Sequence, residues 1–364
     1  MKITSIETIL VRIPFIPTDG DTGFGGKTWS TVDTLLVKVE TDEGITGWGE
    51  AFGYNVIPAT KAALDQIITP LLIGRDATAG GPLMAEMLQK LHLFGRGGPV
   101  IYGLSGIDIA LWDIAGKRAK LPVNQLLGGA AHTSLPCYAS LMPYHDSKKV
   151  AAATSRAVKL GYEYVKLHEI AVPEVRTARQ AAGPGIKMMV DTNCPWTQGE
   201  AVSMANQFRE YDLHWLEEPV WPPENYAALS HVRKTCGIPI SAGENCPTVM
   251  SFQHMFEAGA VDIAQPSPTK IGGITELRQV AAVAAVHNVQ VIPHTPYFGP
   301  GYLAGLHLSS TFRTVTPVEW LFVDMETTLY GGAIVPNQGK ISIPTGPGLG
   351  FDPDPGVIAR FRKS

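Results

Sequence analysis

Seven residues whose side chains carry a charge or a hydroxyl group recur at nearly constant spacing from residue 166 onward. They are Lys166, Asp191, Glu217, Glu244, Ser267, His294 and Glu319, with successive gaps of 25, 26, 27, 23, 27 and 25 residues. Each follows a short apolar run, at a point where a buried strand would favour another apolar side chain. A gap of this size holds one strand and one helix, and the ends of successive strands of a barrel meet at one rim, where barrel enzymes place their active sites. The spacing therefore predicts that all seven side chains face one site.

Three consecutive members of this series are acids: Asp191, Glu217 and Glu244. Converging carboxylates without a cation repel one another and are costly to bury. A hard divalent cation removes that cost, and ligands that are all oxygen favour magnesium over zinc. The alternative open from the residues alone is that these acids cap helices or form ion pairs. In the pair Glu217-Glu218 we interpret the first acid as the ligand and Glu218 as a neighbour that supports the ligands.

The elements that must hold these side chains are short apolar runs that alternate with helical stretches between residues 134 and 325. The eight runs are CYASL (137–141), YVKLH (164–168), MMVDTN (188–193), LHWLEEP (213–219), IPISAGEN (238–245), VDIAQPS (261–267), VQVIPH (289–294) and VEWLF (318–322). Helical stretches lie between them, for example at 147–160, 199–210, 223–235 and 273–287. Repeated strand–helix units are typical of a parallel sheet, and eight of them close a (β/α)8 barrel of the TIM type.

A different pattern precedes the barrel. Residues 3–13 and 33–40 alternate polar and apolar side chains as strands do, and 41–50 is typical of a turn into a third strand. From about 57 to 120 the spacing is helical, so an α+β module is expected. The predicted division is an N-terminal α+β capping domain over 1–128, the catalytic barrel over 129–325, and a C-terminal segment, 326–364, that packs back on the capping domain.

Composition narrows the class of protein. Of 364 residues 45% are hydrophobic and 17% charged, so a large core is possible. The net charge of −4 and the absence of Lys/Arg runs argue against nucleic acid as a partner. No window has membrane-spanning length and the N-terminus lacks a signal-peptide pattern, so neither a membrane nor secretion is expected. The four cysteines show no CxxC spacing, which is typical of reduced thiols in a cytoplasmic protein.

Several motifs occur in an order that is specific in combination. They are GWGEA (47–51), GLSGIDIALWDIAGK (103–117), LLGG (126–129), GYEYVKLH (161–168), VDTN (190–193), WLEEP (215–219), GEN (243–245), KIGG (270–273), VIPH (291–294) and PGLGF (347–351). With these motifs the chain resembles the mandelate racemase-like branch of the enolase superfamily over essentially its full length. The resemblance implies the modified enolase-type barrel with its capping domain, a homo-oligomer, and a small carboxylic acid as substrate.

The resemblance also assigns roles. Enolase-superfamily sites use a Lys or His base, with magnesium stabilising an enediolate. The positions that match imply Mg²⁺ ligands at Asp191, Glu217 and Glu244. They also imply a base at Lys166, a second acid/base at His294 on the opposite side of the substrate, and a hydrogen bond from Glu319 to the substrate carboxylate.

Residues around these positions are expected to bind the substrate or to support the ligands. The loops at about 15–29 and 51–56 match those that close over the substrate, which gives Phe24, Lys27 and Tyr54 as substrate-binding candidates. Aromatic residues after strand ends add Trp196, Trp221, Tyr297 and Phe298, for which packing within loops is an equal alternative. Asn193 and Asn245 adjoin the ligands and are expected to hold them.

Two positions depart from the family pattern. The second-strand motif is commonly Lys-x-Lys, but here it is Lys166-Leu167-His168. His168 shares the strand face with Lys166, so it could orient that lysine, lower its pKa or touch the substrate. At Ser267 the family usually has an Asp that orients the histidine; a serine can accept a hydrogen bond from His294 but supports an imidazolium less well. Lys270 stands off the usual catalytic position and is expected only to support its neighbours.

The expected reaction is abstraction of the α-proton of a carboxylate by Lys166 to give a metal-stabilised enediolate, followed by dehydration of a hydroxy acid or sugar acid. Dehydration is favoured because the weakened His294 need act only as an acid. Racemisation or epimerisation of an α-substituted acid, and cycloisomerisation, remain alternatives. A Schiff-base barrel using Lys166 or Lys270 leaves the three acids unexplained. A non-catalytic paralogue that binds acids is the remaining alternative.

Overall fold

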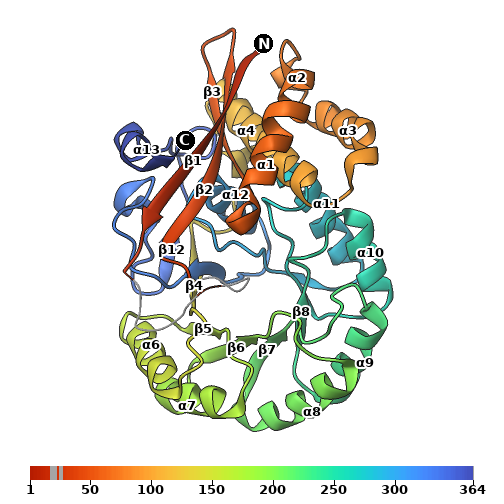
Figure 1. The fold of residues 1–364 in the computed structure, drawn as a ribbon, viewed down its shortest axis with the longest axis vertical. Coiled ribbons are helices and arrows are strands. Elements are labelled where there is room, and N and C mark those ends of the chain that lie inside the picture. Colours follow the sequence, from red (N-terminus) through yellow and green to blue (C-terminus); the bar gives the residue numbers. More distant parts are fainter. Residues whose placement is uncertain (17–22, 24–27, 364) are drawn as a thin grey trace.

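The computed structural model describes residues 1–16, 23 and 28–363 of the chain (Figure 1). The first part is an antiparallel sheet in the order β13-β1-β2-β3, with helices packed against it. Its elements are β1 (Ile3–Pro14), β2 (Thr31–Thr41), β3 (Thr46–Ala51), α1 (Ile57–Ala63), α2 (Thr69–Leu72), α3 (Gly80–Lys90), α4 (Pro99–Ala119) and α5 (Val123–Leu126). We call this part the capping module; the domain boundaries at 128 and 325 stay predictions.

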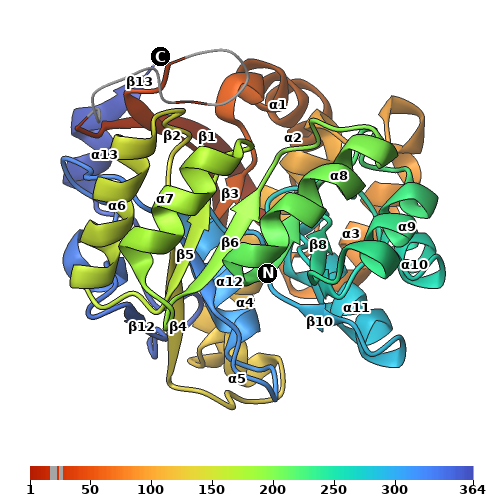
Figure 2. The same ribbon diagram turned by 90° about the horizontal axis from the view of Figure 1, so that it is seen from below.

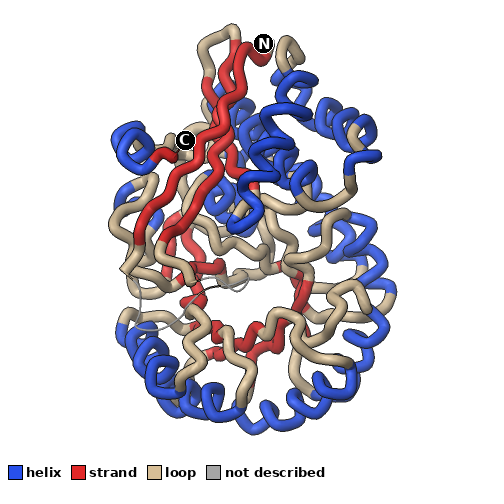
Figure 3. The backbone as a smooth tube through the Cα atoms, viewed as in Figure 1, coloured by secondary structure: helices blue, strands red, loops and turns tan. Residues whose placement is uncertain are grey.

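The second part is a parallel sheet curled into a ring with helices outside it, as the strand colouring of Figure 3 shows. Parallel pairing runs in order from β11 through β4 and round to β10. The strands are β4 (Ser134–Ser140), β5 (Tyr164–Leu167), β6 (Lys187–Asp191), β7 (Leu213–Glu217), β8 (Ile240–Ala242), β9 (Ile263–Ala264), β10 (Gln290–Val291) and β11 (Val318–Leu321). The helices are α6 (Ser147–Lys159), α7 (Val172–Ala182), α8 (Gln198–Phe208), α9 (Tyr226–Cys236), α10 (Val249–Glu257), α11 (Gly273–Val286) and α12 (Pro300–Ser309). Figure 2 gives the side view, in which helices α6 and α7 cover the strands. The predicted barrel of eight strands is confirmed.

Strand register brings the acidic strand ends together. Asp191 is the last residue of β6 and lies opposite Glu217, the last residue of β7. Lys166 in β5 lies opposite Ser140 in β4. The later strands are shorter than the apolar runs indicate, so Glu244 stands two residues beyond β8 and His294 three residues beyond β10. Their side chains therefore reach the rim from loops rather than from paired strands.

Side-chain caps fix where several of the outer helices begin. Asp146, Thr197, Asn225 and Thr248 accept hydrogen bonds from the first backbone N–H groups of α6, α8, α9 and α10. Such caps satisfy donors that have no partner within the helix. Each cap ends a loop that starts at a rim residue, so the caps limit how far those loops can move.

Helix α4 holds the capping module together. It packs against β3 so closely that a Cβ atom on Gly49 would lie 1.8 Å from the carbonyl oxygen of Gly106. Only glycine permits that backbone approach, which gives the GWGEA motif a physical reason. None of the described helices, α4 included, is long and apolar enough to span a membrane.

Two buried carboxylates of the capping module reach the first turns of barrel helices. Asp108 of α4 accepts hydrogen bonds from the backbone N–H and the hydroxyl of Thr275 at 2.9 and 2.5 Å, at the start of α11. Glu50 of β3 accepts from the N–H of Gly301 at 2.8 Å, at the start of α12. The positive end of a helix attracts such groups, but burial dominates and raises the pKa of Asp108 to about 7 and that of Glu50 to about 8. The two acids fasten the module to the barrel.

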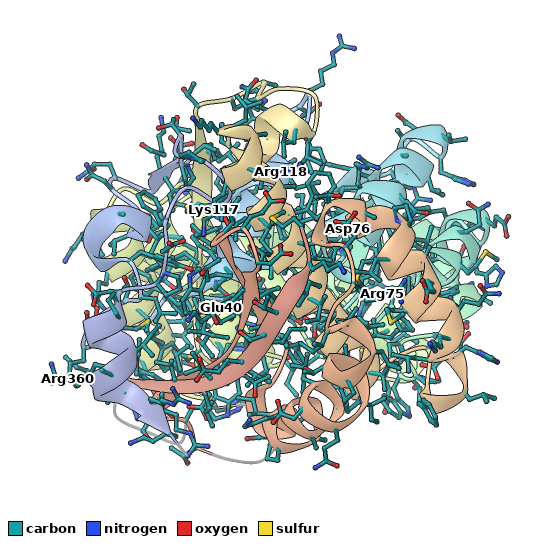
Figure 4. All side chains as sticks on the ribbon, turned by 90° about the horizontal axis from the view of Figure 1, so that it is seen from above. Glu40, Arg75, Asp76, Lys117, Arg118 and Arg360 are labelled. Atoms are coloured by element: carbon teal, nitrogen blue, oxygen red, sulfur yellow. The ribbon has the colours of Figure 1, made fainter. Side chains whose placement is uncertain are left out.

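The tail returns to the capping module through β12 (Lys340–Ser342), α13 (Pro355–Phe361) and β13 (Arg362–Lys363), of which β12 pairs with β4 and β13 with β1. Lys117, labelled in Figure 4, donates to Asp113 at 2.7 Å and to Asp352 of the tail at 2.5 Å. Arg360, also labelled, is ion-paired with Glu326. The pairing of β13 with β1 and the Lys117–Asp352 contact attach the C-terminal segment to the capping module, whereas the Arg360–Glu326 pair lies within the segment.

The Glu50 contact predicts a pH dependence of stability. Glu50 ionises near pH 4.5 when unfolded but near pH 8 when folded, so between these values the folded state keeps a proton that the unfolded state has lost. Stability therefore falls as pH rises, by up to about 1.4 kcal/mol per pH unit. Glu50→Gln stays neutral, so its free energy of unfolding relative to the wild type should rise between about pH 5 and pH 8. Urea denaturation measures this; a difference that does not change with pH, or one shared by the exposed Glu163→Gln control, contradicts the assignment.

Candidate active site

Lys166 is the centre of the predicted rim cluster. Its side chain is 0% exposed, and Nζ lies 3.1 Å from oxygens of each of Asp191, Glu217 and Glu319. Burial alone lowers the pKa of Lys166, but the three carboxylates outweigh burial and hold that pKa well above its ordinary value. Lys166 is therefore a charged counter-ion in this state.

The carboxylates of the cluster differ in their surroundings. Burial and the charge of Asp191 raise the pKa of Glu217 to about 7. Burial opposes ionisation of Asp191 as well, but Lys166 and His168 outweigh it and lower the pKa of Asp191. The cluster thus holds more negative charge than its neighbouring cations fully compensate.

Three of these acids fit a divalent cation. Asp191, Glu217 and Glu244 each present a carboxylate oxygen, and the three oxygens lie within 4.8 Å of one another. The donors are all oxygen, as magnesium prefers, and Glu217 gains a partner for a charge that burial otherwise disfavours. The predicted triad is therefore brought together in space.

His168 occupies a position that the sequence left open. Its Nδ1 lies 2.5 Å from the carbonyl oxygen of Leu141, which can only accept, so Nδ1 carries the proton of that hydrogen bond. Its Nε2 lies 3.2 Å from Asp191 Oδ2. The side chain lines the main cavity of the site, whereas Lys166 does not. In this geometry His168 rather than Lys166 lines the cavity, and the role of Lys166 toward the substrate stays a prediction.

His294 lies on the other side of the acidic triad. Its Nε2 is 2.8 Å from Glu244 Oε2, and the ring lines the main cavity. The expected hydrogen bond to Ser267 is wrong: Ser267 Oγ pairs with the hydroxyl of Tyr297, and the buried Nδ1 of His294 has no hydrogen-bond partner in the described part of the chain. The buried hydroxyl of Tyr297 needs a hydrogen-bond partner, and Ser267 supplies it.

Glu319 is surrounded by donors. Ser140 Oγ donates to Oε1 at 2.8 Å and the N–H of Thr295 lies 3.2 Å from Oε2, in addition to the contact with Lys166. Burial favours the neutral acid, but Lys166 and His294 outweigh it and lower the pKa of Glu319. The expectation of a protonated Glu319 that donates to the substrate is therefore not supported by this environment; the group is an acceptor.

The predicted supporting residues adjoin the ligands. The backbone N–H of Asn193 donates to Asp191 at 3.1 Å, and Asn245 Nδ2 donates to Glu218 at 2.9 Å. Burial and nearby Glu244 raise the pKa of Glu218 well above its ordinary value. Lys270 Nζ lies 3.5 Å from Glu244 and 3.3 Å from Asn245 Oδ1, and Lys270 also lines the cavity. These side chains form a polar layer around the triad.

A cavity of about 510 Å³ lies over the triad, between the barrel rim and the capping module. Of the substrate-binding candidates, Tyr54 lines it, and so does Trp221. Trp196 and Phe298 do not: Trp196 packs against Phe208 and Phe298 against Trp320 in the core. Tyr297 is likewise buried beside Ser267, outside the lining residues. Phe24 and Lys27 lie outside the described residues.

Several lining residues were not predicted. From the capping module Phe52 and Tyr102 line the cavity, and from the barrel so do Ser140, Cys194, Pro223, Pro296 and Leu321. Phe52 follows GWGEA directly, and its ring contacts Tyr54 and Tyr102 with centroid distances of 4.9 Å each. The sequence signal that could have identified it was its place in the loop at 51–56, which was expected to close over the substrate.

Comparisons with known proteins cover both parts of the chain. The "Mandelate racemase / muconate lactonizing enzyme, N-terminal domain" family matches residues 19–128, and "Enolase C-terminal domain-like" matches residues 149–357. D-galactarolactone cycloisomerase of Agrobacterium fabrum is 30% identical, with 100% of this chain and 99% of that protein covered. Arabinonate dehydratase of Saccharolobus solfataricus is 28% identical, with 91% of each covered. A solved mandelate racemase/muconate lactonizing protein from Paracoccus denitrificans, complexed with magnesium, has a TM-score of 0.89 at 28% identity, covering 100% of this chain and 98% of that one.

Removing the lysine charge should expose the repulsion within the cluster. Lys166→Met leaves buried carboxylates without their shared cation, and we expect a loss of about 3 kcal/mol in the free energy of unfolding without metal. Adding Mg²⁺ should recover more stability in this variant than in the wild type, because the ion replaces the missing charge. Lys270→Met, which removes a cation from the edge of the site, is the control and should lose less. Denaturation with and without Mg²⁺ measures the free energy of unfolding of each variant. If Lys166→Met is as stable as the wild type, Lys166 does not offset repulsion among the carboxylates.

Proposed function

Because the chain belongs to the mandelate racemase/muconate lactonizing enzyme family of the enolase superfamily, we propose that it is a magnesium-dependent sugar-acid dehydratase. The observation that carries the proposal is the placing of two cavity-lining histidines, His168 and His294, against the outer members of a three-carboxylate cluster. That arrangement offers proton transfer on both sides of an acid held at the cluster. The name of the arabinonate dehydratase relative supports elimination of water as the outcome.

Asp191, Glu217 and Glu244 would hold the magnesium ion. When bound, the ion supplies positive charge that favours binding of the substrate carboxylate and lowers the cost of the negative charge that forms when the α-proton leaves. The magnesium complex of the Paracoccus denitrificans relative supports this choice of metal.

His168 accepts the α-proton in the proposed reaction. A general base needs a defined tautomer and access to the substrate, and the Leu141 carbonyl fixes the proton of His168 on Nδ1. Nε2 is then the nitrogen that takes the proton from the α-carbon, and its 3.2 Å contact with Asp191 Oδ2 has to open for it to do so. Lys166 is enclosed by carboxylates and is a positioning residue, which keeps Asp191 and Glu217 at the floor of the site through its charge.

His294 supplies the acid for the second half of the reaction. It donates a proton to the hydroxyl on the β-carbon, the β-carbon–oxygen bond breaks, and water leaves as the electrons of the former α-carbon–hydrogen bond form the new double bond. The resulting enol of a 2,3-dihydroxy acid tautomerises to a 2-oxo acid. No strong base is needed at this position, which agrees with a histidine that no carboxylate orients through Nδ1.

Cycloisomerisation is a second candidate function. The galactarolactone cycloisomerase relative is as similar to this chain as the dehydratase is, and the same proton abstraction serves both outcomes. The two differ in what leaves the β-carbon: water from an open acid, or a ring oxygen that stays in the product. Product analysis by mass separates them, because only dehydration lowers the mass by one water.

The assignment of His168 and His294 predicts two different defects. With Mg²⁺ and a panel of 2,3-dihydroxy acids in D2O, His168→Gln should lose deuterium exchange at the α-carbon by about 10²-fold or more. His294→Gln should keep exchange but lose water elimination, because only the acid step is removed. Nuclear magnetic resonance of substrate and product measures both. Exchange that survives in His168→Gln returns the base to Lys166, and a wild type without exchange or turnover on any acid contradicts the proposed function.

A further inference from the structure

The exposure of the residues that line the cavity changes sharply from its floor to its mouth. At the floor His168 is 8% exposed and Asp191 2%, and the side chain of Glu244 is 16% exposed. Trp221, on the loop after β7, is 65% exposed although it lines the same cavity. Among the large apolar residues that the described structure leaves exposed, Trp221 is the one that lines this cavity. An indole at that place is available to a ligand.

The backbone beneath Trp221 is held firmly. Its N–H donates to the carbonyl of Trp196 at 2.8 Å, next to a bridge between Trp196 and Val220. A few residues later the N–H of Asn225 donates to the carbonyl of Pro222 at 3.0 Å, and the Asn225 side chain caps α9. A side chain on a fixed loop binds a ligand at a lower cost in conformational entropy. The hydrogen-bonded loop thus holds the backbone of Trp221 in place before a ligand binds.

The opposite wall is aromatic as well. Phe52, Tyr54 and Tyr102 of the capping module line it, and Phe52 contacts both tyrosines at centroid distances of 4.9 Å. Aromatic faces accept the apolar carbon–hydrogen side of a sugar chain, and the tyrosine hydroxyls can bind its polar side. This aromatic wall is therefore suited to carbons that bear hydroxyl groups.

Charge limits what that end can bind. Among the described residues that line the cavity, Lys270 is the one lysine or arginine, and its Nζ already lies beside Glu244 and Asn245 and 4.8 Å from the Phe52 ring centroid. Among these described residues none offers a second substrate carboxylate a cationic partner of its own, and losing its water without such a partner is unfavourable. A single carboxylate at the metal cluster meets no such cost.

We propose that Trp221 is a specificity-determining residue that supports the distal carbons of a polyhydroxy monocarboxylic acid of five or six carbons. The inference rests on the proposed function and names its substrate class. The indole lies along the carbon chain beyond the reacting α- and β-carbons, so it contributes to binding of long substrates and leaves the chemical step unchanged.

The test compares substrates of different length in the full-length protein with Mg²⁺. Trp221→Ala should raise KM for six-carbon monoacids about tenfold while leaving KM for a three-carbon 2,3-dihydroxy acid and kcat for both within about twofold. Trp221→Phe should restore most of the loss. Phe94→Ala, at a residue 62% exposed that does not line the cavity, is the matched control and should change neither constant.

Each remaining outcome decides a separate point. An equal rise in KM for short and long acids, or no rise, overturns the role of Trp221 while the proposed function stands. A lower KM for the six-carbon diacid than for the monoacid of the same length in the wild type overturns the monocarboxylic assignment. A wild type that acts on none of these acids overturns both the proposed function and this inference.

Discussion

The structure depends on how several buried carboxylates can share one small space. Asp191, Glu217 and Glu319 each have an oxygen 3.1 Å from Lys166 Nζ. Glu244 contacts His294 and Lys270 instead. Without compensating cations such a cluster would protonate or open. Burial and the charge of neighbouring Asp191 raise the pKa of Glu217 to about 7, although Lys166 lies beside it. In the proposed function a divalent cation among the three acids would supply the missing charge, which would explain why the chain keeps them so close.

The rest of the fold serves that cluster in two ways. The barrel delivers one functional side chain from each of several successive strands, and strand register places Asp191 and Glu217 side by side. The capping module closes the space above with Phe52, Tyr54 and Tyr102, and it is fastened by Asp108 and Glu50 at the starts of α11 and α12. In the proposed function both parts are needed: the barrel would supply charge and proton transfer, and the capping module would supply the aromatic wall that lines the cavity.

Sequence spacing predicted the barrel and the acidic triad because both follow from the strand–helix repeat, which has a nearly constant length. The resemblance assigned the base to Lys166 rather than His168. Residues two apart in a strand share a face, so the sequence could not show that only His168 lines the cavity. It failed for Trp196 and Phe298 because a loop residue just past a strand can turn either into the cavity or into the helix layer. Sequence spacing also could not predict the hydrogen-bond partner of Ser267. That partner is the hydroxyl of Tyr297, which lies 30 residues away in the chain.

The most direct test of this account is to find the ion. Crystals grown with Mn²⁺ in place of Mg²⁺ should give one anomalous difference peak within about 2.5 Å of an oxygen from each of Asp191, Glu217 and Glu244, with Lys166 displaced from at least one of the acids. A peak elsewhere, or no peak while Lys166 keeps all of its contacts with the carboxylates, contradicts the claim that these acids hold a divalent metal.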